Sequence, residues 1–404
     1  MNTLLDEDEV MLKESAATLL GAESPASLVR SAEASDLKYS PELWRRVADL
    51  GWCGLCLPEE YDGQGAPLAW LGLLLEEVGR HIAPIPLATS SAVALTIARF
   101  GIGSQREILR SVASGESILS WAVQESGGAW NIDAVSMPGR VDGDDVVLDG
   151  TKLFVDGADA ATHFLVAIRR QPDDAIGIAL VDARAAGIAS KRLVNMAKGD
   201  QATVSFRNVR IPRSQVIGGW SRGRDALTFL MQLAAVFSAS LMAGAARRVT
   251  EMSAEYSNIR FAFGQPIGSF QSLQHMVADM LITVDAVELL SREALWRIDS
   301  GLPAEIEVAQ AKSFGSQHCI TVCRSAQQLH GGMGFMIEFD LNLWYRRVVS
   351  WSLCAGTAYE HRRIIASHLL DRPGHMRLDD CHPEAGDEQG RLEGHNETEL
   401  EVVK

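Results

Sequence analysis

The chain has 404 residues, of which 47% are hydrophobic and 22% charged, so it is long enough for two or three globular domains with a large apolar core. Its 37 Lys and Arg residues against 52 Asp and Glu residues give a formal charge of −15, which excludes a protein that binds nucleic acid through a basic surface.

Six cysteines are too few for a disulfide framework, and the CxxC pair Cys53 and Cys56 lacks the further ligands of a zinc site. The acidic N-terminus has no apolar signal segment, so we expect a cytoplasmic protein without a bound metal.

Helical patterns predominate up to about residue 118. Ser40 followed by Pro41 predicts an N-cap and the first turn of a helix. The apolar spacing over residues 70–81 predicts a second helix.

Between about residues 120 and 212 the apolar pattern changes to a period of two. Residues 146–157 contain two Asp-Gly dipeptides, which predict turns. Short strands are expected at 162–170, 176–183 and 203–211. We interpret this part as an antiparallel β domain, which disfavours a Rossmann fold.

Helical patterns return over residues 225–368, where Ala226–Ala246 contains no charged residue. Its length would allow a membrane span, but its polar side chains favour a helix buried in a large bundle. From Asp371 onward the chain has ten acidic and four basic residues, and we expect a loosely ordered tail. The expected divisions are 1–118, helical; 119–213, a β-barrel; 214–371, four helices; and 372–404, the tail.

The usual nucleotide-binding and hydrolase motifs are missing from the sequence. Isolated polar and glycine positions stand instead in apolar surroundings. Each alone has an ordinary structural explanation, whereas their order along the chain is informative. They are Glu125, Arg260, Phe263-Gly264-Gln265, Gln328, Gly331-Gly332, Arg346 and Ala355-Gly356-Thr357.

Taken together, these segments resemble the acyl-CoA dehydrogenase family over roughly nine-tenths of the chain. The resemblance implies a mostly helical α+β fold: an N-terminal helical domain, a middle β-barrel and a C-terminal four-helix bundle, assembled as a tetramer. The matching segments are LPEEYDGQG (57–65), LLEEVGRHIAPIP (74–86), AVQESGGAW (122–130), DGTKLFVDGADAATHFLVAIR (149–169), RFAFGQPIGSFQ (260–271) and QQLHGGMGFMIEFDLNLWYR (327–346).

The resemblance implies FAD as the cofactor. Arg260 of one subunit would hold the pyrophosphate, and the Gln-x-x-Gly-Gly turn of a neighbour would add backbone donors. Residues 124–125 and 154–156 would lie along the flavin ring, with Phe154 in place of the usual tryptophan. The full set of implied cofactor residues is Gln124, Phe154, Asp156, Arg260, Phe263, Gln271, Gln328, Gly331, Gly332 and Thr357.

Asp156 stands where the family usually places a threonine hydroxyl near the flavin N5 atom. An ionised carboxylate only accepts hydrogen bonds, as oxidised N5 does, so Asp156 would have to point away or be protonated. We favour a third interpretation, in which Asp156-Gly157 is a hairpin turn with only its backbone facing the flavin.

The catalytic base of the family is missing at both of its usual positions. The family's reaction needs a carboxylate to take the α-proton of the acyl thioester. Ala355 occupies one glutamate position and Ala234 the other, and Ala235 replaces a substrate-binding arginine. We therefore assign no catalytic residue to this chain.

Three hypotheses follow from this loss. The first is an FAD-binding subunit whose homologous, glutamate-bearing partner supplies the base, acting on a bulky polycyclic or branched acyl-CoA, with reoxidation by an electron-transfer flavoprotein. The second is a self-sufficient homotetramer that uses Glu338, Glu360 or Asp156 as the base. The third is an FAD-binding assembly protein without activity of its own.

Overall fold

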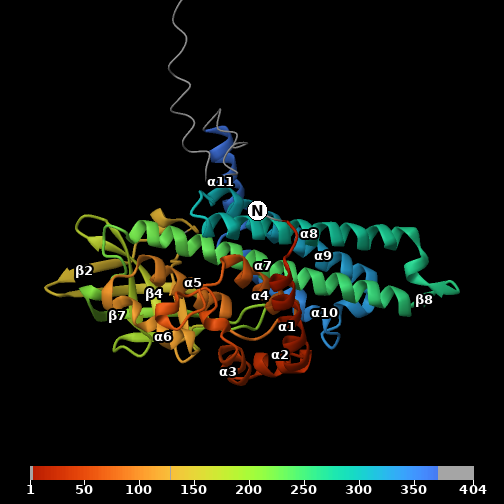
Figure 1. The fold of residues 1–404 in the computed structure, drawn as a ribbon, viewed down its shortest axis with the longest axis horizontal. Coiled ribbons are helices and arrows are strands. Elements are labelled where there is room, and N and C mark those ends of the chain that lie inside the picture. The colour runs from red at the N-terminus through yellow and green to blue at the C-terminus, as the bar shows by residue number, and fades with distance from the viewer. Residues whose placement is uncertain (1–2, 128, 372–404) are drawn as a thin grey trace, which may run out of the picture.

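The computed structural model describes residues 3–127 and 129–371, with helices at both ends of the chain and a curled sheet between them (Figure 1). This arrangement confirms the predicted fold class. The helices are α1 (Glu7–Glu23), α2 (Ala26–Ala34), α3 (Pro41–Asp49), α4 (Leu68–Arg80), α5 (Leu87–Phe100), α6 (Ile108–Ala113), α7 (Gly223–Ile259), α8 (Gln271–Asp299), α9 (Glu305–His330), α10 (Leu341–Leu353) and α11 (Ala358–Leu370). The strands are β1 (Leu119–Ala122), β2 (Pro138–Asp142), β3 (Asp145–Asp156), β4 (His163–Gln171), β5 (Ile176–Asp182), β6 (Ile188–Arg192), β7 (Gln201–Pro212), β8 (Phe261–Ala262) and β9 (Gln265–Pro266).

The predicted helix start at Ser40 is confirmed. The Ser40 hydroxyl accepts a hydrogen bond from the backbone N–H of Leu43 at 3.2 Å, and Pro41 stands in the first turn of α3. Helix α4 confirms the second predicted helix: it begins two residues earlier and ends one residue earlier than predicted, with His81 as its C-cap.

The central sheet has seven strands in the order β1-β4-β2-β3-β7-β6, and β5 pairs with β4. The expectation of an antiparallel domain is wrong in part, because β4 pairs in parallel with both β1 and β2. Parallel neighbours require a long connection between them, and period-two patterning carries no information on strand direction.

Of the two Asp-Gly dipeptides predicted as turns, Asp149-Gly150 lies within β3, whereas Asp156-Gly157 leads into a turn over residues 157–160. At Gly150 the strand continues through a register shift against β7, a β-bulge in which a Cβ atom would lie 2.9 Å from the Met137 side chain. Asp156-Gly157 ends β3, but the next strand, β4, does not pair with it, so the predicted hairpin is absent from the described sheet.

Helix α7 forms the centre of the C-terminal bundle, with α8 and α9 running beside it (Figure 1). It is long and apolar enough to cross a membrane, but 89% of its most apolar window is buried inside the protein. Its apolar character is therefore accounted for by core packing, as predicted from the sequence.

Two glycines allow α4 to lie directly against α7. A Cβ atom at Gly244 would be 1.7 Å from the Glu76 carbonyl oxygen, and one at Gly79 would be 2.0 Å from the Leu241 carbonyl oxygen. The contact fixes the N-terminal helices on the bundle and thereby one wall of the site described below.

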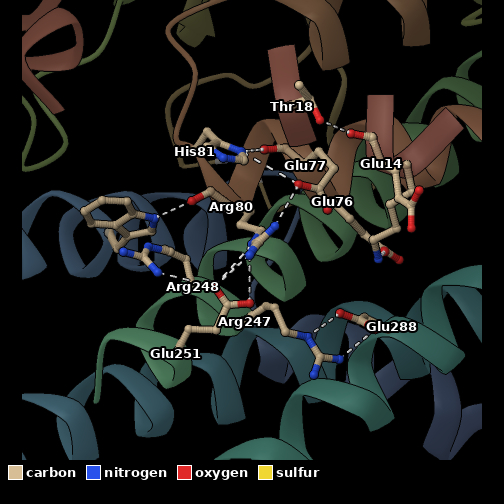
Figure 2. Close-up of polar contacts among 12 residues, drawn as sticks. Glu14, Thr18, Glu76, Glu77, Arg80, His81, Arg247, Arg248, Glu251 and Glu288 are labelled. Carbon is tan, nitrogen blue, oxygen red and sulfur yellow. Dashed lines mark hydrogen bonds and ion pairs between the residues drawn. The ribbon is translucent and has the colours of Figure 1, made fainter. Parts of the chain in front are cut away.

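Charged side chains extend the same contact, as Figure 2 shows. Arg80 of α4 donates to Glu251 of α7 with an N–O distance of 2.9 Å, and Arg247 of α7 donates to Glu288 of α8 at 3.0 Å. These pairs connect three helices across partly buried surfaces.

Within the described chain the CxxC pair, a buried Cys53 and a half-buried Cys56, forms no metal site. Burial raises the pKa of both thiols to about 12, and within residues 3–127 and 129–371 no group of three His, Cys, Asp or Glu side chains could hold a metal ion. The predicted acidic tail lies outside the described residues.

Candidate active site

Two adjoining cavities lie where the sheet meets the bundle. The larger, of about 450 Å³, lies between the ends of β1 and β3 and the end of α10, and is called the flavin cavity here. The smaller, of about 160 Å³, extends between α5, α7 and α10 and is called the acyl cavity. Their shared wall consists of Trp121, Asp156, Asn195, Ser350 and Cys354.

Three of the predicted cofactor residues line the flavin cavity. They are Gln124, Phe154 and Asp156. Phe154 has a positive φ of 55° and stays 47% exposed, which presents its ring as an apolar wall. The cavity therefore offers a flat apolar surface beside amide and carboxyl groups.

Glu125 has a different role from the one predicted. Its carboxylate accepts from the ammonium group of Lys152, which is fully buried, with a distance of 2.7 Å. It also accepts from the backbone N–H groups of Ser136 and Met137 at 3.1 and 3.0 Å. Burial lowers the pKa of Lys152 to about 8, although Glu125 opposes this shift. The pair fixes the second half of β3 behind the cavity.

Asp156 contributes a protonatable carboxyl to the shared wall. Its Oδ1 atom accepts a hydrogen bond at 2.9 Å from the side-chain amide of Gln201, the residue of β7 that pairs with Asp156 in the sheet. The Asp156 side chain also contacts Cys354. Burial raises the pKa of Asp156 to about 6, and the two hydrogen bonds oppose that rise. The interpretation that only the backbone of Asp156 faces the site is therefore wrong.

The turn after α10 is held rigidly even though it carries no carboxylate at Ala355. Ala355 lines the flavin cavity in a left-handed conformation with φ of 53°, and its carbonyl oxygen accepts from the Nε2 atom of His361 at 2.8 Å. The fully buried Lys312 donates to the carbonyl oxygens of Trp351 and Ser352 at 2.8 and 3.2 Å. Burial lowers the pKa of Lys312 to about 7.

The hydroxyl of Thr357 caps α11. It hydrogen-bonds with Glu360 in a capping box, and the Glu360 carboxylate also accepts from the backbone N–H of Trp130 at 2.9 Å. Glu360 is therefore fully engaged in local contacts. The predicted contact of Thr357 with the cofactor stays a prediction.

The remaining predicted cofactor residues lie together at the far end of the bundle. Tyr256 near the end of α7 stacks on His330 at the end of α9, with ring centroids 4.4 Å apart. Arg260 follows α7 26 residues after Ala234, which lines the acyl cavity, so about 39 Å of helix separates them. We call this group the distal cluster: Arg260, Phe263, Gln271, Gln328, Gly331 and Gly332, all exposed.

Arg346 and Glu338 take structural positions. Arg346 donates to both carboxylate oxygens of Glu33 on α2, at 3.0 and 2.9 Å, and to the carbonyl oxygen of Met196 at 3.1 Å. The side chain of Glu338 is exposed beyond the end of α9, outside both cavities as described.

Besides Lys38, two charged residues of the acyl cavity were not predicted. Asp200 accepts from the backbone N–H groups of Asp159 and Ala160 at 2.9 and 3.3 Å, and burial raises its pKa to about 6. Arg347 enters the cavity from α10. Neither has a sequence motif, and only the spacing of Arg347 from Cys354 along one helix face could have indicated it.

Models of known families match this architecture at both ends of the chain. The acyl-CoA dehydrogenase N-terminal domain matches residues 6–116, and the acyl-CoA dehydrogenase C-terminal domain matches residues 221–370. The chain therefore belongs to the acyl-CoA dehydrogenase family.

Individual relatives agree with this assignment. A probable acyl-CoA dehydrogenase, YngJ of Bacillus subtilis, is 27% identical over 82% of this chain and 90% of its own. A variant of the Tcur3481-Tcur3483 steroid ACAD is 28% identical with a TM-score of 0.82, covering 89% of this chain and 97% of its own. A chain of the ChsE4-ChsE5 complex from Mycobacterium tuberculosis is 25% identical with a TM-score of 0.85, and the match covers 92% of this chain and 100% of that one.

Proposed function

We propose that this chain is the FAD-binding subunit of an acyl-CoA dehydrogenase whose catalytic base comes from a homologous partner subunit. The observation that carries the proposal is the turn at Ala355: it lines the flavin cavity and is held by His361, yet it has no carboxylate. Ala234, the second position where family members place the base, lines the acyl cavity without a carboxylate as well. The assembly would catalyse α,β-dehydrogenation of an acyl-CoA thioester.

The residues present fit FAD, which is the cofactor of this family and accepts the hydride when bound. Phe154 and Gln124 would border its ring. Arg260 would hold the pyrophosphate as a forked cation, and Gly331 and Gly332 have open space where a Cβ atom would stand, as close backbone approach requires.

The separation of these two groups supports assembly with a second chain. The distal cluster lies about 39 Å along α7 from the acyl cavity, so one chain's distal cluster would complete the other's flavin cavity. Arg260 and the Gln328 turn would then come from the same chain, and not from two subunits as expected from the sequence. The exposed apolar side chains Ile259, Phe261 and Phe335 beside the distal cluster are also typical of an assembly surface.

Two relatives support the proposed partner and substrate. The ChsE4-ChsE5 complex supports a partner of the same family, and the Tcur3481-Tcur3483 steroid ACAD supports a bulky, polycyclic or branched acyl group. An electron-transfer flavoprotein would reoxidise the flavin, and the assembly, a tetramer, would act in the cytoplasm.

A second candidate is a self-sufficient homomer with Asp156 as the base. Of the three carboxylates considered, Asp156 alone lines both cavities, and its pKa of about 6 suits proton transfer near neutral pH. Glu360 is engaged by Trp130 and Thr357, and Glu338 is exposed outside the cavities.

The test compares the chain expressed alone with the chain co-expressed with a glutamate-bearing homologue. We measure dehydrogenation of acyl-CoA with an artificial electron acceptor, together with native mass and flavin content. The proposal expects the lone chain to be about 10²–10⁴-fold slower, the usual contribution of a general base. Full turnover by the lone chain, abolished by Asp156→Asn, would instead establish the second candidate.

A further inference from the structure

The acyl cavity contains a buried arginine whose hydrogen-bonding groups are mostly unused. Arg347 of α10 lines the cavity with its side chain 13% exposed. Its one hydrogen bond within the described chain runs from Nη2 to the Oε1 atom of Glu33 at 3.3 Å. The Nε atom is buried and has no acceptor among the described residues. A guanidinium carries five N–H donors, so most of them have no acceptor here.

Charge balance around Arg347 is also incomplete. The side chain of Glu33 is only 6% exposed, and both of its carboxylate oxygens already accept from the Nη2 atom of Arg346, at 3.0 and 2.9 Å. One carboxylate therefore faces two guanidinium groups. Burial lowers the pKa of Arg347, and the Glu33 carboxylate opposes that change without cancelling it. A buried charge of this kind is normally paired, so a ligand acceptor would complete it.

The position of Arg347 relative to the flavin cavity defines where that acceptor would lie. Arg347, Ser350 and Cys354 follow one face of α10 into the acyl cavity, and Cys354 belongs to the wall shared with the flavin cavity. Seven residues of helix between Arg347 and Cys354 correspond to about 10 Å. The opposite wall of the cavity includes the apolar side chains Phe237 and Leu241 of α7.

We infer that Arg347 is a specificity residue for an acyl group that carries an oxygen acceptor, a carboxylate or a carbonyl, remote from its thioester. This inference rests on the proposed function, because it assumes that the thioester end lies at the flavin cavity. The apolar wall of the cavity contacts the hydrocarbon part, and Arg347 binds the distal oxygen by charge-assisted hydrogen bonds.

Two other charged residues, Asp200 and Lys38, line the same cavity as Arg347. The Oδ2 atom of Asp200 is held by two backbone N–H groups, and its buried Oδ1 atom has no partner among the described residues. The ammonium group of Lys38 donates to the backbone carbonyl oxygen of Glu33 at 2.6 Å, whereas the hydrogen bond of Arg347 runs to the Glu33 carboxylate. Carboxylate and carbonyl oxygens share the chemistry that Arg347 recognises, so the probes below separate them.

The experiment measures dissociation constants by calorimetry on the FAD-loaded assembly that contains this chain. The probes are octanoyl-CoA, suberoyl-CoA, which adds a terminal carboxylate, and an octanoyl-CoA with a keto group next to its terminal methyl. At least one oxygenated probe is expected to bind about tenfold or more tightly than octanoyl-CoA, as hydrogen bonds to a charged group provide. The better of the two identifies the oxygen class.

Variants of Arg347 test whether this residue causes the preference for the oxygenated probes. Arg347→Met should abolish the preference and leave octanoyl-CoA affinity within about threefold, whereas Arg347→Lys should keep part of the preference for the carboxylate. Arg363→Met, an exposed arginine on α11, is the control that should change neither.

The outcomes distinguish this inference from the proposed function. Equal affinity for all three probes overturns the inference alone, and this comparison needs no variant to fold. A preference that persists in Arg347→Met overturns it as well. An FAD-loaded assembly that binds none of the probes overturns the proposed function together with the inference.

Discussion

Replacing the carboxyl of Asp156 with an amide should stabilise the protein at neutral pH. In the folded chain burial raises the pKa of Asp156 from 3.8 to about 6. The folded state therefore binds more protons than the unfolded state between these two values. The resulting stability is fully present below about pH 3.8, falls as the pH rises, and is lost above about pH 6.

The size of the effect follows from the same values. A rise of the pKa from 3.8 to about 6 corresponds to about 3 kcal/mol between the two limits, with roughly half of it lost by pH 5. The amide that replaces the carboxyl cannot ionise, and its oxygen can still accept from Gln201. Asp156→Asn should therefore be more stable than the wild type by up to about 3 kcal/mol at neutral pH.

The assay is scanning calorimetry of the FAD-loaded assembly near pH 5 and near pH 7.5. We expect the Tm of Asp156→Asn to exceed the wild-type Tm by a few degrees at the higher pH and by less at the lower. Asp200 also has a raised pKa, and its charge contributes to the raised pKa of Asp156, so the difference between variant and wild type reports Asp156 together with its coupling to Asp200. Asp144→Asn, at an exposed position, is the control. A Tm difference that does not change with pH would refute the reasoning.

Three further changes test other parts of the structure. Gly244→Ala should lower the free energy of unfolding in urea by about 3 kcal/mol, because the added Cβ overlaps α4, whereas Gly21→Ala, with its nearest neighbour at 3.6 Å, should be neutral or slightly stabilising. Lys152→Met leaves a mostly buried carboxylate unpaired and should cost about 3 kcal/mol or more in the same measurement; an unchanged midpoint would contradict the role given to the pair. Arg260→Ala should strip FAD from the purified assembly, measured by flavin absorbance, and full retention would show that the pyrophosphate is held elsewhere.

The sequence predicted local structure wherever a single segment decides it. Ser40 and Pro41 determine the start of α3 through one hydrogen bond and one fixed dihedral. Strand β4 follows from its apolar pattern alone. The parallel pairing of β1 with β4 could not be predicted in this way, because it depends on a long connection rather than on either strand.

At the candidate site, too, features set by one segment were predicted and features set by tertiary contacts were not. The loss of the base at Ala355 is visible in the sequence, because motif spacing fixes the position of that turn. The acyl-cavity residues Asp200 and Arg347 have no motif, and their importance comes from burial and unpaired atoms, which are tertiary properties. The ion pair of Glu125 was not predicted for a related reason: Lys152, its partner, is 27 residues away in the sequence, and only the folded chain brings the two side chains together.

The structure around Ala355 argues that the turn has a role although its carboxylate is gone. A non-glycine residue with φ of 53° is strained by about 1–2 kcal/mol, and this strain persists only where surrounding contacts determine the conformation. Two such contacts are the hydrogen bond from His361 and the buried ammonium group of Lys312, which has its own desolvation cost. What these contacts preserve is the position of the backbone at residue 355, where an N–H group facing the cavity could polarise a thioester carbonyl. This geometry supports the proposal above of a subunit that binds substrate while a partner supplies the base.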